Sequence, residues 1–487
     1  MSKQELTFGK SAVITTFSKI LAYAISLVTT MLLSRFRTLQ EYGTHSQMLM
    51  VINLFSSVIM LGLPSSLNYF IARAETIQEK RDFISLYYSL NTTVSLVVGT
   101  VLVLSVPLIE SYFKNDLISK FSYFICLYPW AKIINEGAEN LFIVFKRPLI
   151  LMIYRVSHSI IMLVCILIIQ ALSLGFSHYV FAFLLIEAIY ALFVYLMAGK
   201  FVKGIHISFN PSLLKKVMVF SVPLGLSLAT GTLKAEMDKL TIGFLFSTEE
   251  LALYANAAKE LPLTIIAASF TAVLLPIIAG MIKDKKIESA IELWKDTTVF
   301  CLIINVYFAI GLFFFSKEAV MFLYSEKYVP GKDVFAVYSL LLILRSTYFG
   351  MILNVTGNTK IILKGSIISL VINFVLNIAC YLWFGFIGPA IATVVCTLWN
   401  SIYQLQHTSK VTQVKFVNVF PFKEAFKIIL INLLLGLIFF AFKTYSPLCH
   451  YIGEIPTAFL CAVIWCVFDI VIFRKDLRHF FAVMKKS

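Results

Sequence analysis

Long apolar stretches separated by short polar loops run along almost the whole chain. An α-helix needs about 20 apolar residues to cross the hydrocarbon core of a bilayer. Stretches of this length recur from the first to the last hundred residues, and their ends are defined to within about four residues. They predict fourteen transmembrane helices, at about residues 11–33, 44–72, 83–108, 120–145, 149–173, 178–199, 216–246, 252–282, 294–316, 334–354, 361–383, 386–406, 425–445 and 454–473.

The composition agrees with this pattern. Hydrophobic residues make up 59% of the 487 residues and charged residues 14%, whereas soluble domains contain about 45–50% and about 25%. So few charges cannot cover the surface of a soluble protein of this size. The first apolar run, residues 11–33, is too long for the core of a signal peptide, so we interpret it as a retained span. We therefore predict an all-α polytopic membrane protein with almost no soluble domain.

The charge distribution predicts the orientation of the spans. If the N-terminus lies in the cytoplasm, the inside segments hold 25 Lys and Arg and the outside loops hold 8. Cytoplasmic loops of membrane proteins carry such an excess of Lys and Arg. We therefore expect both termini in the cytoplasm, and we attribute the net charge of +15 to these loops rather than to nucleic-acid binding.

The sequence offers little for metal, nucleotide or cofactor chemistry. None of the eight cysteines forms a CxxC pair, and nearly all lie in apolar runs. Small core side chains are the simpler interpretation, with metal binding or disulfide formation as the alternative. The phosphate-binding motif GxxxxGK[ST] does not occur, and the outside loops are too short for a catalytic domain. We expect no metal, no cofactor and no enzyme activity.

Weak self-similarity divides the chain into two halves. A shift of 212 residues superposes Tyr42 on Tyr254 and Pro64 on Pro276 without a gap. This distance corresponds to six spans, so both halves would have the same orientation in the membrane, as in transporters with parallel repeats. We therefore predict an N-lobe at 1–205, a C-lobe at 206–415, and two further spans with a tail at 416–487.

Eight of the 41 Lys and Arg fall inside the predicted spans. A charge in mid-bilayer costs about 2.5–3.5 kcal/mol on insertion scales, so these cations must pair or line a water-filled cavity. Lys239, Lys259 and Lys295 lie near span ends, and an interfacial position is an alternative for them. The full set is Lys19, Lys132, Arg155, Lys234, Lys239, Lys259, Lys295 and Arg345.

The spacing of charges in two spans favours a cavity. Lys132, Glu136 and Glu139 stand at i, i+4 and i+7, which places them on one face of a helix. Lys234 and Asp238 are one turn apart in the seventh span. Neutral intrahelical ion pairs with a structural role explain the same spacing, and this alternative stays open.

Lys19, Arg155 and Arg345 have no acidic residue one turn away. Unpaired cations inside a membrane mark substrate pathways, whereas His158, on the same face as Arg155, is more simply a core histidine. The candidates for substrate binding are Lys19, Lys132, Arg155, Lys234, Lys259 and Arg345. The candidates for ion coupling are Glu136, Glu139, Glu187 and Asp238.

This excess of cations indicates an anionic cargo, because Lys and Arg are the usual ligands of phosphate. Prolines also occur in spans 2, 7 and 8, where they free a carbonyl and permit a kink. They suit the hinges of a transporter and static packing kinks equally. The four prolines are Pro64, Pro223, Pro262 and Pro276.

Several short motifs occur in an order and spacing typical of one transporter group. They are Leu33-Ser34-Arg35-Phe36, Glu41-Tyr42-Gly43, Leu61-Gly62-Leu63-Pro64, Phe220-Ser221-Val222-Pro223, Asp238, Tyr254-Ala255-Asn256-Ala257-Ala258, Thr356-Gly357-Asn358-Thr359, Asn373 to Asn377, and Gly385-Phe386-Ile387-Gly388-Pro389-Ala390. Across about residues 8–410 the chain resembles the polysaccharide-exporting, Wzx-type (O-antigen) flippases. These form the polysaccharide transporter family of the multidrug/oligosaccharidyl-lipid/polysaccharide exporter superfamily.

The resemblance implies a fold and a function. It implies two six-helix lobes around a central cationic cavity, with spans 13 and 14 packed outside, and it places Lys19, Lys234 and Lys259 on helices that line such cavities. The implied cargo is a polyprenyl-diphosphate-linked oligosaccharide, moved by alternating access from the cytoplasmic to the outer leaflet for O-antigen or capsule assembly. The implied location is the bacterial inner membrane. Implied partners are membrane lipids, a polysaccharide polymerase and a chain-length regulator.

Two other functions stay open. A cation-coupled multidrug exporter of the same superfamily would favour unpaired carboxylates in its cavity, whereas most acids here have a basic neighbour. A membrane glycosyltransferase or polysaccharide polymerase would present a large outer loop with catalytic residues. The longest outside loop, about 317–333, is too short for that role.

Overall fold

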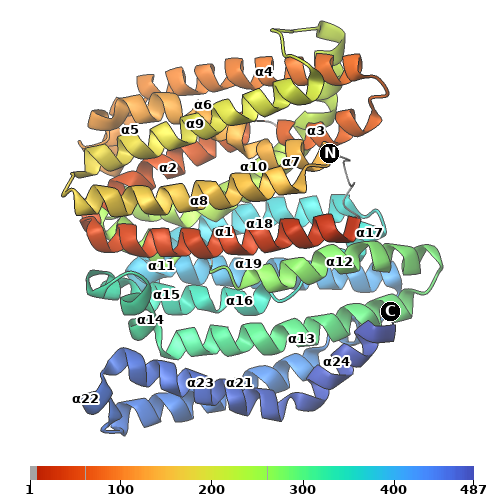
Figure 1. Cartoon of the computed structure of the whole chain (residues 1–487). Coiled ribbons are helices and arrows are strands. Elements are labelled where there is room, and N and C mark those ends of the chain that lie inside the picture. The colour runs from red at the N-terminus through yellow and green to blue at the C-terminus, as the bar shows by residue number, and fades with distance from the viewer. Residues whose placement is uncertain (1–7, 61, 260, 487) are drawn as a thin grey trace. The chain divides into compact units, whose positions relative to one another are not determined.

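The computed structural model describes residues 8–60, 62–259 and 261–486, and all regular structure in these ranges is helical (Figure 1). The chain divides into two compact units, residues 1–252 and 253–487. This division follows the seventh long helix, whereas the predicted lobes meet at residue 205. The lobe boundaries therefore stay a prediction, and the two units are described separately.

The first unit is built on long helices that pack along one another. Here α1 packs against α8, while α6 packs against both α4 and α9. The last long helix, α10, packs along α2 and α3. The elements are α1 (Phe8–Phe36), α2 (Leu39–Ile59), α3 (Leu63–Arg73), α4 (Ile77–Leu104), α5 (Val106–Phe113), η1 (Ser119–Phe121), α6 (Ser122–Glu136), α7 (Ala138–Val144), α8 (Pro148–Ala171), α9 (Phe176–Val202), α10 (Pro211–Leu245) and the start of α11 (Thr248–Ala257).

The second unit is centred on α13, which packs against α12, α15, α21 and α23. The pair α18 and α19 forms a helical hairpin, and α19 also packs against α15, α16 and α17. The elements are α12 (Thr264–Lys283), α13 (Ile287–Phe314), α14 (Ser316–Leu323), η2 (Glu326–Gly331), α15 (Lys332–Ser339), α16 (Leu341–Leu344), α17 (Met351–Val355), α18 (Thr359–Phe384), η3 (Gly385–Ile387), α19 (Gly388–Thr412), α20 (Phe416–Val419), α21 (Phe422–Tyr445), α22 (Leu448–Ile452), α23 (Glu454–Ile472) and α24 (Arg474–Lys486).

The polytopic all-α prediction is confirmed. In the described residues, ten helical stretches are long and apolar enough to cross a membrane, or eleven if α2 and α3 form one bent span. The continuous stretch Thr359–Thr412 contains both α18 and α19, which correspond to two predicted spans. The predicted spans 120–145 and 334–354 correspond to the broken series α6–α7 and α15–α17. The count of fourteen is compatible with this arrangement.

Glycine and proline account for the break in the second span. The helices α2 and α3 meet at an angle of 42°. Gly62 has φ of 71°, and Pro64 stands in the first turn of α3. The left-handed conformation is accessible to glycine without the steric cost of a side chain. A Cβ at Gly62 would also lie 2.7 Å from the backbone nitrogen of Gly225 in α10. Both the positive φ and this close backbone contact therefore favour glycine at position 62.

The predicted internal repeat appears in the order and length of the helices. The helices α4 and α13 are both 28 residues long and begin at residues 77 and 287. Next in each half is an eight-residue helix, α5 or α14, which begins at residue 106 or 316. The helices α8 and α9 begin at residues 148 and 176, and α18 and α19 begin at residues 359 and 388. These offsets of about 210 residues match the six-span repeat period.

The same helix start occurs in both halves. At the start of α2, the Thr38 hydroxyl accepts a hydrogen bond from the Glu41 backbone N–H, and the Glu41 carboxylate accepts one from the Thr38 N–H. At the start of α11, Ser247 and Glu250 make the same reciprocal pair. This capping box satisfies two N–H groups that a helix terminus otherwise leaves unpaired.

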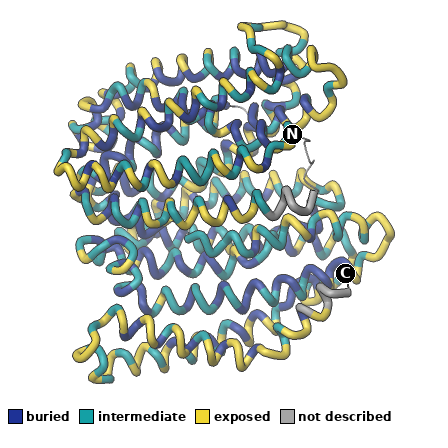
Figure 2. Tube along the Cα trace, viewed as in Figure 1, coloured by how far each residue is buried: buried dark blue, intermediate teal, exposed yellow. Residues whose placement is uncertain are grey.

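Many large apolar side chains are exposed along the long helices, as the distribution of exposed residues in Figure 2 illustrates. Leu104 and Leu108 are 76% and 73% exposed, and Leu382 and Trp383 are 73% and 81% exposed. Soluble monomers rarely expose contiguous apolar surface of this extent. In a membrane protein these side chains face lipid, so their exposure agrees with the hydropathy pattern.

The two C-terminal spans, α21 and α23, lie outside the repeat and pack against α13. Their shared core contains a polar cluster. The Asn432 side-chain amide donates to Asp469 at 2.9 Å, and the Trp465 indole N–H donates to the Asn432 side-chain oxygen at 3.1 Å. All three residues are buried. This network aligns the two helices, because each polar group would otherwise lie unpaired in an apolar interior.

Candidate substrate cavity

A cavity of about 440 Å³ lies inside the first unit. Five helices contribute to its wall, and most of the residues that line it are polar or charged. The lining residues are Lys19, Ala22, Tyr23 and Ser26 from α1, Tyr128, Lys132, Asn135 and Glu136 from α6, Glu139 from α7, Tyr154, Arg155, His158 and Ser159 from α8, and Glu187 from α9. Six of the ten residues selected from the sequence are in this set.

The polar stripe predicted for the fourth span lines this cavity. Lys132 and Glu136 lie one turn apart on α6, with the Lys132 Nζ 3.5 Å from the Glu136 Oε2. The Glu136 side chain is 46% exposed. Ion pairs with this exposure contribute little to stability. The intrahelical ion pair considered as a structural alternative is therefore formed, but it contributes little to the stability of the fold.

Gly137 separates α6 from α7 and so determines the position of Glu139. A Cβ at Gly137 would lie 2.4 Å from the Tyr87 hydroxyl, so the close approach of Tyr87 requires glycine here. Glu139 then stands in the first turn of α7. It still lines the same cavity as Lys132 and Glu136.

Arg155 of α8 connects three helices. One of its terminal nitrogens, Nη2, lies 2.5 Å from the Glu139 Oε2 on α7. The other, Nη1, donates to the Thr15 carbonyl on α1 at 3.3 Å. The sequence showed no acidic residue one turn from Arg155, and the structure supplies its carboxylate from a different helix. No signal within α8 could have indicated this pair.

Glu187 is the most buried carboxylate of the cavity, at 8% exposure. Its Oε2 accepts a hydrogen bond from the Asn135 side-chain amide at 2.8 Å, and its Oε1 lies 3.1 Å from the His158 Nε2. The His158 ring also meets the Tyr190 ring edge-on. Sequence reasoning treated His158 as a core residue and missed its contact with Glu187. The shared face of Arg155 and His158 was the available signal.

Lys19 differs from the other cations of the cavity. Its side chain is exposed within the wall formed by α1, where Tyr23 follows one turn later. Within the described residues, no carboxylate lies within ion-pair distance of Lys19. The residues that line the cavity include three cationic side chains and three carboxylates, namely Lys19, Lys132, Arg155, Glu136, Glu139 and Glu187. Lys19 is the cation whose charge is left for a ligand.

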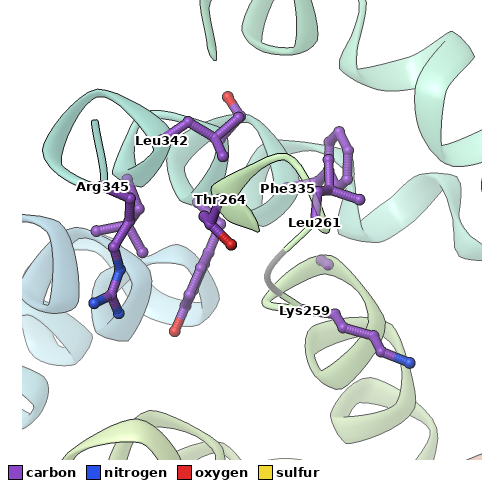
Figure 3. Close-up of a pocket in the computed structure, with 10 residues that line it drawn as sticks. Lys259, Leu261, Thr264, Phe335, Leu342 and Arg345 are labelled. Atoms are coloured by element: carbon purple, nitrogen blue, oxygen red, sulfur yellow. The ribbon is translucent and has the colours of Figure 1, made fainter. Parts of the chain in front are cut away.

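Two further candidates, Lys259 and Arg345, line a small pocket of about 20 Å³ in the second unit. The pocket also contains Thr264, Leu261 and Phe335. Figure 3 shows the ammonium group of Lys259 and the guanidinium of Arg345 pointing in different directions. The pocket has room for about one water molecule. This geometry does not gather the two cations around a common ligand.

Lys234 and Asp238 lie on α10 and are not among the described residues that line either cavity. Asp238 is 1% exposed, and its carboxylate accepts the backbone N–H of Lys239 at 2.8 Å. Lys239 in turn contacts Glu236 at 2.9 Å. The roles of Lys234 and Asp238 in transport stay predictions.

The described residues contain no group of three or more His, Cys, Asp or Glu side chains arranged to hold a metal ion. The side chains that line the first cavity are suited to ligand recognition. Cationic donors bind phosphate, carboxylates accept hydrogen bonds from hydroxyl groups, and tyrosine rings provide apolar faces. Such a lining suits a ligand with an anionic group and many hydroxyl groups.

Comparison with known families supports this interpretation. A family model described as polysaccharide biosynthesis protein matches residues 32–333. The chain is 23% identical over 240 residues to the capsular polysaccharide biosynthesis protein CapF of Staphylococcus aureus, covering 49% of this chain and 56% of that protein. It is 24% identical over 186 residues to the probable low-salt glycan biosynthesis flippase Agl15 of Haloferax volcanii, covering 37% and 39%. The matched regions thus span about half of these relatives or less.

Solved structures with the same fold are membrane transporters. The lipid II flippase MurJ, in an inward closed conformation, aligns with a TM-score of 0.69 and 17% identity over 95% of this chain and 99% of that chain. An inward-facing multidrug resistance MATE family transporter aligns with a TM-score of 0.61 and 14% identity over 83% and 99%. A MOP superfamily transporter from Pyrococcus furiosus aligns with a TM-score of 0.55 and 15% identity over 84% and 96%.

The structural alignments establish the fold, and the family model covers more than half of the sequence. The resemblance read from the short motifs is thereby confirmed. This multi-pass membrane protein belongs to the polysaccharide biosynthesis protein family.

Proposed function

We propose that the protein is a flippase that moves a polyprenyl-diphosphate-linked oligosaccharide from the cytoplasmic to the outer leaflet for surface polysaccharide assembly. The observation that carries the proposal is the cavity in the first unit, where Lys19, Lys132 and Arg155 line one space inside a membrane protein. Membership of the polysaccharide biosynthesis family and the fold shared with transporters support it.

The diphosphate is the part of this cargo that needs the protein most. At a separation of about 4 Å, two unit charges attract by about 4 kcal/mol at an effective dielectric constant of about 20, and by about 1 kcal/mol in water. Cations fixed inside the membrane therefore offset part of the desolvation cost of the phosphates. Lys19 and Arg155 are the proposed phosphate ligands.

The remaining lining suits the sugars. Tyr23, Tyr128 and Tyr154 offer ring faces, and Ser26 offers an exposed hydroxyl that can form hydrogen bonds with sugar hydroxyl groups. The polyprenyl tail would stay in the bilayer while the headgroup crosses. This mechanism needs no covalent step, so we assign no enzyme activity and no cofactor.

Alternating access would come from movement of the two six-span repeats, with lobes at 1–205 and 206–415 and an appended segment at 416–487. The charge distribution of the loops supports a cytoplasmic location for both termini. A bacterial inner membrane location and partnership with a polymerase and a chain-length regulator complete the proposal.

A complementation experiment tests this function. A flippase-deficient strain would receive the unaltered gene, Lys19→Ala, Arg155→Ala, or Lys200→Ala as a control that removes an exposed cation at the end of α9. We expect Lys19→Ala and Arg155→Ala to reduce surface glycan strongly at normal protein levels, and Lys200→Ala to restore it. Full surface glycan from both cavity variants would refute the charge mechanism.

A second candidate is a cation-coupled multidrug exporter. The buried Glu187 favours it, because a carboxylate deep in a cavity wall can exchange a coupling ion. This function predicts drug resistance in a sensitive host that Glu187→Gln abolishes. Under the flippase proposal, expression of the protein leaves drug sensitivity unchanged.

A further inference from the structure

The three carboxylates of the cavity are held in different ways. Glu187 is buried and has hydrogen-bonding partners on two other helices. Glu136 pairs with Lys132 of its own helix, at 3.5 Å. Glu139 pairs across helices with Arg155, and its side chain is 45% exposed to the cavity. Only the Glu139 carboxylate is thus both in contact with a proposed phosphate ligand from another helix and free to move into water.

The geometry at Arg155 favours exchange of its anionic partner. The Arg155 Nη2 lies 2.5 Å from the Glu139 Oε2, so this carboxylate occupies one position on the guanidinium. The guanidinium has a second anchor, because Nη1 donates to the Thr15 carbonyl. Arg155 can therefore keep its position when Glu139 leaves. A guanidinium binds carboxylate and phosphate oxygens through the same planar set of donors.

We propose that Glu139 is an intramolecular competitor for the phosphate site: in the empty protein its carboxylate occupies the position on Arg155 that a phosphate group of the cargo takes on binding. This inference rests on the proposed function, since it assumes a diphosphate ligand. On binding, a phosphate group replaces the Glu139 carboxylate as the anionic partner of Arg155, so the guanidinium has an anionic partner both before and after binding.

Replacement of Glu139 by a phosphate on Arg155 would also change how α7 is held against its neighbouring helices. Glu139 lies in α7, which packs against α3 and α8. On α7, the Asn140 side-chain oxygen accepts a hydrogen bond from Asn68 of α3 at 2.9 Å. Loss of the Arg155–Glu139 ion pair removes one polar contact between α7 and α8. The hydrogen bond between Asn68 and Asn140, which connects α3 to α7, stays in place. Phosphate binding would therefore weaken the attachment of α7 to α8, while their apolar packing, which includes the contact between Phe142 and Tyr154, stays in place.

The chain offers a matched control in Glu136. Its side chain is 46% exposed, as against 45% for Glu139, and both carboxylates line the same cavity. Glu136→Gln and Glu139→Gln each remove one negative charge from this space. A general gain of positive potential would therefore affect both variants equally. A difference between them isolates the direct contact with Arg155.

The experiment measures binding of a polyprenyl diphosphate to the purified full-length protein in lipid nanodiscs. We expect Glu139→Gln to bind about 3- to 10-fold more tightly than the unaltered protein, in line with removal of a partly buried ion-pair competitor. We expect Glu136→Gln to change affinity less than about 2-fold. Glu139→Asp, which keeps the charge but shortens the reach to Arg155, should also tighten binding and serves if Glu139→Gln does not fold.

The outcomes separate this inference from the proposed function. If the unaltered protein binds the diphosphate but the Glu139 variants bind no more tightly than Glu136→Gln, the exchange is overturned and the function stands. If the unaltered protein shows no saturable binding, both are overturned. A purely structural role for the Arg155–Glu139 pair predicts weaker binding and a lower unfolding temperature for Glu139→Gln, which is the opposite sign in affinity.

Discussion

Replacement of Lys19 by glutamine tests the cavity most directly. Lys19 is exposed on α1, and no carboxylate of the described residues pairs with it, so its removal leaves no buried charge without a partner. Glutamine keeps most of the side-chain length and its hydrogen-bonding capacity. We therefore expect Lys19→Gln to fold normally, with an unfolding temperature close to that of the unaltered protein. Its effect should appear in ligand binding.

The expected size of the effect follows from the interaction that is lost. A hydrogen bond to a charged group contributes about 1.5–3 kcal/mol. At about 1.4 kcal/mol per factor of ten, this corresponds to a loss of about 10- to 150-fold in affinity for a polyprenyl diphosphate. Arg155→Gln should lose a similar amount and should also lower the unfolding temperature, because Glu139 and the Thr15 carbonyl lose their partner.

The assay is equilibrium binding in nanodiscs, with Lys200→Gln as the control. Lys200 is exposed at the end of α9 and does not line the cavity, so this substitution removes the same charge elsewhere. A loss of less than about 2-fold for Lys19→Gln, or an equal loss for Lys200→Gln, would refute the assignment of Lys19 as a phosphate ligand, because neither outcome fits a direct charge-assisted contact.

Two predictions concern stability. A Cβ at Gly43 would lie 2.2 Å from the backbone oxygen of Thr248, so we expect Gly43→Ala to lower the free energy of unfolding by about 1–3 kcal/mol, as overpacking does. Gly280→Ala, where a Cβ meets nothing within 4 Å, is the control, and equal thermal unfolding of the two variants would contradict the close approach. Asn432→Leu removes a partner of the buried Asp469. It should cost about 1–3 kcal/mol in thermal unfolding experiments, and no change would argue against the polar cluster.

The transmembrane fold was predictable because lipid imposes local rules. A span must be apolar over about 20 residues and must satisfy its backbone hydrogen bonds within itself, so hydropathy and helix coincide. The repeat was predicted from the 212-residue shift that superposes Tyr42 on Tyr254 and Pro64 on Pro276. The structure adds the capping pairs Thr38–Glu41 and Ser247–Glu250, which begin a helix in the same way in each half. The breaks within spans were harder to locate. At Gly137, for example, the requirement for glycine comes from Tyr87, fifty residues away.

In the candidate site, too, the features that depend on local sequence were predictable and those that depend on helix packing were not. Helical periodicity was sufficient to group Lys132 and Glu136, because residues four apart share a face of α6. Glu139 lies beyond the break at Gly137, in α7, so its place in the same wall depends on the tertiary structure. The sequence also marked Lys19 and Arg155 as cations that a structural bundle would not place in lipid. Lys234 and Lys259 were selected as substrate-binding candidates on the same grounds, whereas neither is among the residues that line the larger cavity.

The sequence by itself determined that the chain crosses the membrane many times, and it predicted a six-span repeat and a set of cations that must avoid lipid. Only the tertiary structure decided which of these charges meet. The partner of Arg155 lies on α7 and the donors to Glu187 lie on α6 and α8. Such pairs depend on how helices distant in sequence pack and rotate against one another. Periodicity places a residue on a face of its helix, but packing decides what that face meets.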